Sequence, residues 1–172
     1  MDGDLLRAWI RQARADLGAG CSLAGEECHR RYWLQQACEK ALKAFGLILW
    51  HGPEDDSVLR RRFLLQHSPL SVLAAEPDLP KPLRALVREI KAELGQMDNG
   101  KLLLQLEGTT PTTNATDVSY RYPFVDTDGN ARAPADWTAT DWNAYQGNAQ
   151  GLSAALSRFL DRIERRRRLS RR

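Results

Sequence analysis

The segment Tyr32–Gly46, with the sequence YWLQQACEKALKAFG, constrains the fold of this chain more than any other segment. It is rich in Ala, Leu, Lys, Gln and Glu, which are the strongest helix formers. Its apolar residues recur every three or four positions, which indicates a helix with one buried side: Trp33 or Leu34, Ala37, Cys38, Ala41, Leu42, Phe45, Ile48 and Leu49. A helix this apolar must be covered, so the segment predicts a bundle with about three partner helices.

A polar row lies beside this apolar stripe, and its members again follow helical spacing. It consists of Gln36, Glu39, Lys40 and Lys43. Two interpretations remain open. The row lines a ligand-binding groove, or it is an exposed or dimer-facing surface of the helix.

Partner helices are predicted on both sides of the central segment. We expect helices at Leu5–Leu17 with Asp4 as N-cap, at about Glu26–Leu49, at Ser57–Gln66, at Pro69–Ala75 with Ser68 as cap, at about Leu83–Leu94, and from Asp141 to about Arg166 with Thr138 or Thr140 as cap. Leu102–Leu106 is either a last helical turn or a docked segment. The pattern therefore predicts an all-α, up-and-down bundle of four long helices plus a short helix.

A long irregular loop is predicted before the last helix, over residues 107–137. This stretch has Thr-rich turns, prolines and glycines but no helical period, and loops of this length are usually functional or disordered. Its middle, Val118–Phe124, is too aromatic for a free linker. We therefore expect it to pack back against the bundle.

The length of 172 residues and the hydrophobic content of 42% fit a single domain, with a core over about residues 4–165. No run of about 18 apolar residues predicts a membrane span, and the first residues lack the features of a secretory signal. Three cysteines without a paired spacing favour reduced thiols, with Cys28 and Cys38 as small core residues. We therefore expect a cytoplasmic protein without metal or cofactor.

The net charge of +3 is concentrated in a basic tail over residues 165–172. Such a run of arginines can bind phosphates. It is also an ordinary solvated helix end, where cations suit the helix dipole. The second interpretation is preferred, because no aromatic residues alternate with the arginines.

The run Trp33–Ala44, with the sequence WLQQACEKALKA, resembles the QQAxEKxLKA helix of HEPN domains, small helical domains named for their occurrence in higher eukaryotes and prokaryotes. Three further elements match in order, and they are Asp16-Leu17, His67-Ser68-Pro69-Leu70 and Tyr120-Arg121-Tyr122-Pro123. The resemblance covers roughly residues 4–165. It implies a bundle of four or five helices, often homodimeric through helix faces.

The resemblance implies two classes of function. Many HEPN proteins are metal-independent RNases with an Arg-x4–6-His motif late in the domain. Others lack the motif and act as binding or accessory proteins, sometimes beside a minimal nucleotidyltransferase in bacterial toxin-antitoxin or defence systems, or as proposed nucleotide binders. A purely structural interaction module is a third possibility.

The RNase interpretation places its chemistry on Arg62 and His67, an Arg-x4-His string. RNA cleavage needs an acid or base that titrates near neutral pH and a cation beside the phosphate, and His and Arg supply these. On a continuous α-helix the two residues would lie roughly 140° apart. The string also precedes the third helix instead of lying late, so capping by His67 and a solvated basic face at Arg60–Arg62 remain the alternatives.

Tyr120, Arg121 and Tyr122 form a second candidate site. An arginine between two aromatic rings can hold a phosphate while the rings stack on a base. It can equally anchor the loop through an ion pair with a carboxylate such as Glu39. We expect Arg121 and His67 to converge on the polar row, and we favour a binding or accessory protein over an enzyme.

Overall fold

The structure is a computed structural model that describes residues 3–23, 26–51, 57–67, 69–74, 78–108, 123–125 and 129–169. The predicted all-α fold is confirmed. Four long helices account for most of it, and they are α1 (Gly3–Ser22), α2 (Glu27–Leu49), α5 (Lys81–Gly95) and α8 (Ala149–Leu169). None of the described helices is both long and apolar enough to span a lipid bilayer.

Shorter elements connect these four helices. They are α3 (Ser57–Leu59), which continues into the π-helical segment η1 (Arg60–Leu64), α4 (Pro69–Ala74), α6 (Gly100–Gly108), the 3-10 turn η2 (Pro134–Asp136) and α7 (Ala139–Gln146). The predicted irregular loop also contains two short antiparallel strands, β1 (Phe124–Val125) and β2 (Ala131–Arg132). Leu102–Leu106 belongs to α6, so it is helical and not merely docked.

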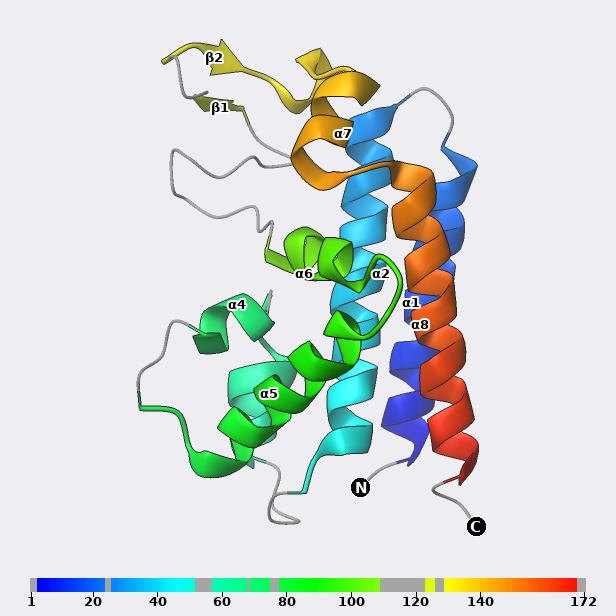
Figure 1. The fold of residues 1–172 in the computed structure, drawn as a ribbon, viewed down its shortest axis with the longest axis vertical. Helices are drawn as coiled ribbons and strands as arrows, with labels where there is room; N and C mark the ends of the chain where they lie inside the picture. Colours follow the sequence, from blue (N-terminus) through cyan, green and yellow to red (C-terminus); the bar gives the residue numbers. More distant parts are fainter. Residues whose placement is uncertain are drawn as a thin grey trace.

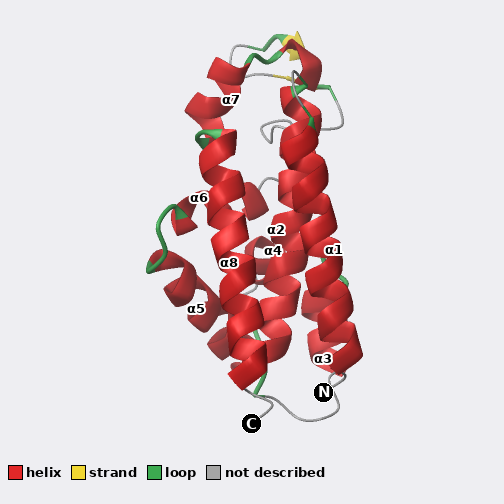
Figure 2. Cartoon of the chain, turned by 90° about the vertical axis from the view of Figure 1, so that its right-hand side faces the viewer, coloured by secondary structure: helices red, strands yellow, loops and turns green. Residues whose placement is uncertain are grey.

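The three longest helices, α1, α2 and α8, lie side by side and form one half of the molecule (Figures 1 and 2). The connection between α1 and α2 is short, so the two helices run in opposite directions, as predicted. Helices α4, α5 and α6 pack on the other side of α2, and α7 lies at the end of the molecule opposite the two termini (Figure 1). Helix α2 therefore contacts α1 and α8 on one side and α5 and α6 on the other.

The core is organised around α2, as its apolar stripe predicts. Phe45 on α2 meets Phe159 on α8 edge to face, with the ring centroids 5.2 Å apart, and both side chains are fully buried. Cys28 and Cys38 are buried thiols, which confirms their predicted place in the core, whereas Cys21 is exposed. Burial of this stripe on two sides gives α2 the large apolar contact that stabilises a bundle.

The segment predicted as an α-helix over Ser57–Gln66 is mostly π-helical. The Leu65 N–H donates to the Arg60 carbonyl at 2.9 Å, which is the i to i+5 bond of a π turn. Phe63 is fully buried against Gly46 on α2, where an added Cβ would lie 2.2 Å from the Phe63 ring. Only glycine at position 46 leaves room for the Phe63 ring. The π turn of η1 thus coincides with the packing of Phe63 against α2.

The helix predicted from Asp141 to about Arg166 is two helices, α7 and α8. They separate at Gly147, whose φ of 77° lies in the left-handed region that favours glycine. Thr138, one of the two predicted caps, begins α7: its Oγ1 accepts from the Asp141 N–H at 3.3 Å, and the Asp141 carboxylate accepts from the Thr138 N–H at 2.8 Å. This is a capping box.

The described part of the basic tail continues α8 to Leu169. Arg162 and Arg166 both pair with Glu93 on α5, and Arg14 on α1 pairs with Asp161 at 2.5 Å. Two arginines of α8 therefore link this helix to α5, and Asp161 links it to α1. Arg165 and Arg168 are exposed, as in the solvated-end interpretation.

Candidate functional site

The polar row of α2 lies largely inside the protein. Glu39 and Lys43 are each only 4% exposed, while Gln36 and Lys40 are partly buried. The interpretation of the row as an exposed surface is therefore wrong for Glu39 and Lys43. Their helical spacing is i to i+4, which puts both side chains on one face of α2.

Glu39 and Lys43 form a buried ion pair. Lys43 Nζ lies 2.5 Å from Glu39 Oε1, and the same ammonium group lies 5.1 Å from the ring centroid of Trp9 on α1. The indole face attracts the cation, and the carboxylate neutralises it. Removal of two charges from water is costly, and the ion pair and the contact with the Trp9 ring offset part of this cost.

The row continues through Lys40 to α1. Lys40 Nζ lies 2.8 Å from Asp16 Oδ2, at an angle outside hydrogen-bond geometry, so this contact is an ion pair only. Gln12 Nε2 donates to Asp16 Oδ1 at 2.7 Å, and Lys40 donates to Gln36 Oε1 at 2.9 Å. Asp16 is 2% exposed, so a second buried carboxylate joins the row.

His67 reaches the row from the turn that follows η1. Its Nδ1 lies 3.4 Å from Glu39 Oε2, while 79% of its side chain is exposed. The structure therefore places His67 beside the polar row, whereas Arg121, which was expected to converge there with it, lies outside the described residues. Glu39 thus has Lys43 on one oxygen in the interior and the imidazole on the other oxygen at the surface, an arrangement that can hold His67 in a fixed orientation.

Arg62, the other half of the Arg-x4-His string, is exposed on η1. The π-helical segment ends at Leu64, and His67 lies three residues beyond it, in the turn that follows. The separation of roughly 140° expected on an α-helix therefore does not apply. Tyr120, Arg121 and Tyr122 lie outside the described residues, as does Ser68.

Two members of the site were not assigned to it from the sequence. Asp16 was assigned only to a family motif, and Trp9 is a partly buried residue of the helix predicted at Leu5–Leu17. Asp16 is adjacent to Leu17 on the side of α1 that buries Ile10 and Ala13. A carboxylate on a buried helix face is a sequence signal for a buried cation partner, and Lys40 is that partner.

Among residues that the structure describes, no group of three or more His, Cys, Asp or Glu side chains is placed to bind a metal ion. Comparison of this chain with protein-family models, with curated proteins and with solved structures yields no significant match. The site is therefore interpreted from its own residues.

Proposed function

We propose that this chain is a HEPN-like binding or accessory protein, and that its ligand or partner contacts the polar row of α2 at His67. The ligand is a nucleotide or an RNA phosphate, or the partner is a protein such as a minimal nucleotidyltransferase of a bacterial toxin-antitoxin or defence system. The contact between the exposed imidazole of His67 and the buried carboxylate of Glu39 carries this proposal. An oriented polar group above a buried charged cluster suits recognition of a polar ligand.

The charge pairing within the row favours binding over catalysis. RNA cleavage needs a cation that is free to stabilise the crowded phosphate. The two cations of the row are engaged, since Lys43 pairs with Glu39 and Lys40 pairs with Asp16. The row therefore offers a positioned imidazole without an ammonium group to assist it.

The segment that carries His67 also supports a protein partner or a homodimer. Val58 and Leu65 are exposed apolar residues at its two ends, and three consecutive exposed arginines, Arg60–Arg62, lie between them. Exposed apolar side chains beside arginines are typical of protein interfaces. Contact of a partner with this segment would cover His67.

The alternative is a metal-independent ribonuclease that uses Arg62 and His67. The observation in its favour is that both side chains are exposed on one short segment, Arg62 on η1 and His67 in the turn after it, where the 140° separation of a continuous α-helix does not apply. In that case the guanidinium supplies the missing cation and the imidazole transfers the proton. The purely structural interaction module is the remaining alternative.

One set of variants tests these proposals. Wild type, His67→Ala, Arg62→Ala and the control His29→Ala are compared for thermal stabilisation by ATP and by short RNA, and for cleavage of labelled RNA. A ligand at 100 times its Kd stabilises a protein by about 2.7 kcal/mol. We expect stabilisation that His67→Ala alone loses, without cleavage. Cleavage by wild type that both site variants abolish would establish the ribonuclease; absence of stabilisation and cleavage would leave only protein partners.

A further inference from the structure

The two ring nitrogens of His67 have different surroundings. Nδ1 lies 3.4 Å from Glu39 Oε2, and the Glu39 side chain is only 5% exposed. Nε2 is at the outer end of the ring, and 79% of the His67 side chain is exposed. In a neutral imidazole, the hydrogen bond made by one nitrogen determines which of the two carries the proton. The contact with Glu39 therefore bears on the hydrogen-bonding character of the nitrogen at the outer end of the ring.

Glu39 can only accept a hydrogen bond at this position. Its Oε1 lies 2.5 Å from Lys43 Nζ, and an ion pair with an ammonium group requires the ionised carboxylate. An ionised carboxylate has no proton to donate. Oε2 must therefore be faced by a donor, and on the ring of His67 this donor is Nδ1–H.

The carboxylate and the imidazole are both held where they meet. Lys43 is 4% exposed, and its ammonium group lies 5.1 Å from the ring centroid of Trp9, so the cation stays in the interior. The turn before His67 is closed by Gln66, whose Nε2 donates to the Arg61 carbonyl at 2.9 Å. The contact between the two side chains is therefore built into the fold and does not depend on a ligand.

We propose that Glu39 is a positioning residue that keeps the proton of the neutral His67 imidazole on Nδ1, so that His67 presents the lone pair of Nε2 to its ligand. An unprotonated ring nitrogen accepts hydrogen bonds. The group that reaches His67 is therefore a hydroxyl or an N–H. In a nucleotide or RNA ligand it is a sugar hydroxyl or a base N–H, and not a phosphate oxygen. This inference rests on the proposed function only for the presence of a ligand at His67, because the position of the proton is a property of the ligand-free chain.

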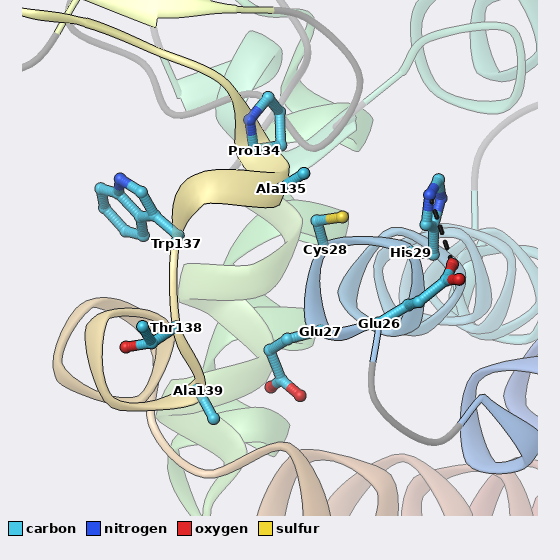
Figure 3. Close-up of a pocket in the computed structure, with 9 residues that line it drawn as sticks. All are labelled: Glu26, Glu27, Cys28, His29, Pro134, Ala135, Trp137, Thr138 and Ala139. Carbon is cyan, nitrogen blue, oxygen red and sulfur yellow. Dashed lines mark ion pairs between the residues drawn. The ribbon is translucent and has the colours of Figure 1, made fainter.

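His29 has the reverse arrangement and serves as an internal reference. It lies in the first turn of α2, where its Nε2 is 3.5 Å from Glu26 Oε2 (Figure 3). Both side chains are mostly exposed, and they line a cavity of about 550 Å³ that is formed by residues 26–29 and by residues 134, 135 and 137–139. Because this carboxylate faces Nε2, His29 should carry its proton on the opposite nitrogen from His67.

Nitrogen-15 NMR of the ligand-free full chain tests the proposal, because protonated and unprotonated ring nitrogens resonate at widely separated shifts. Spectra are recorded at about pH 9, above the range in which histidines usually titrate, and the rings of His29, His51 and His67 are assigned by substitution. We expect the Nδ1–H tautomer of His67 in about fivefold excess, the effect of one net hydrogen bond of ordinary strength. His29 should instead carry its proton on Nε2. A proton mainly on Nε2 of His67, or equal populations of the two tautomers, would overturn the proposal.

Two double variants separate the role of Glu39 from that of the rest of the polar row. Glu39→Leu/Lys43→Met removes one ion pair without leaving an unpaired buried charge, and it should shift His67 to the tautomer mixture of a solvent-exposed histidine. The matched control Asp16→Leu/Lys40→Met removes the neighbouring ion pair and should leave the tautomer of His67 unchanged. A retained Nδ1 proton in the first variant, or an equal shift in the control, would overturn the role of Glu39.

Sulfate tests the hydrogen-bonding character of Nε2 directly, because it is a tetrahedral anion whose oxygens only accept hydrogen bonds. Its addition to the wild-type chain should not move the proton of His67 to Nε2. A protonated Nε2 in the presence of sulfate would overturn the proposal. Absence of ATP and RNA binding in the thermal assay would contradict the proposed nucleotide or RNA ligand and would not alter these spectra, so the two failures are distinguishable.

Discussion

Glu39 and Lys43 show how a single pair of charged residues can be accommodated inside a helical protein. Each side chain is almost fully buried, each neutralises the other at 2.5 Å, and the Trp9 ring covers the ammonium group. A buried pair of this kind adds little net stability compared with apolar residues, although loss of one member is costly. We interpret the pair as a device that orients Glu39 toward His67.

Lys43→Met should lower the free energy of unfolding by about 3–5 kcal/mol, because it leaves the Glu39 charge buried without its cation. The double variant Glu39→Leu/Lys43→Met should recover much of this loss, since no unpaired charge remains. Urea denaturation measures all three free energies. The control Lys91→Met, at an exposed position of α5, should change stability by less than about 0.5 kcal/mol. A single variant as stable as wild type would contradict the buried pair.

At the scale of single elements, helix starts and turns decide where the functional side chains lie. The π-helical turn of η1 places Phe63 on Gly46 and brings the chain to His67 beside Glu39. The capping box at Thr138 starts α7, and Gly147 ends it before α8 begins. Each of these local features determines the direction of the following residues, so the positions of His67 and of the cavity wall depend on them.

Thr138→Ala should lower the free energy of unfolding by about 0.5–2 kcal/mol, because the first turn of α7 loses its side-chain cap. Thr140→Ala lies two residues further on, inside the helix and exposed, and it should change stability by less than about 0.5 kcal/mol. Thermal and chemical unfolding of the two variants measure the difference. Equal effects would show that Thr138 does not act as the cap.

At the scale of the whole molecule, α2 connects two packed groups of helices. On one side α1 and α8 lie along its length, and on the other side α5 and α6 contact it (Figure 1). The Phe45–Phe159 contact joins α2 to α8 near the centre of the first group. We therefore expect α1, α2 and α8 to open as one cooperative unit.

Phe159→Ala should remove about 3–5 kcal/mol of stability and should increase hydrogen exchange in α1, α2 and α8 together. Leu73→Ala, a buried truncation on α4, should instead increase exchange mainly in α4, α5 and α6. Exchange measured by mass spectrometry distinguishes the two patterns. Faster exchange confined to α8 in the Phe159 variant would show that the three helices do not unfold together.

Much of the fold could be predicted from the sequence, because helix periodicity and capping are local properties. The four long helices, the central place of α2 and the buried thiols of Cys28 and Cys38 follow from residue spacing alone. The break at Gly147 was missed, because one glycine in a helical pattern is often tolerated. The π turn was missed because the contact that accompanies it, the Phe63 ring against Gly46, joins two separate segments.

The candidate site was predicted in part. Helical spacing alone puts Gln36, Glu39, Lys40 and Lys43 on one side of α2, and the turn at His67 was expected nearby. The chain by itself determined which side chains form the row, because spacing along one helix fixes their common face. Only the tertiary structure decided that Glu39 and Lys43 are buried, that Asp16 pairs with Lys40, and that residues 26–29 line one pocket together with residues 134, 135 and 137–139. These features depend on the packing of segments distant in sequence, which no local pattern specifies.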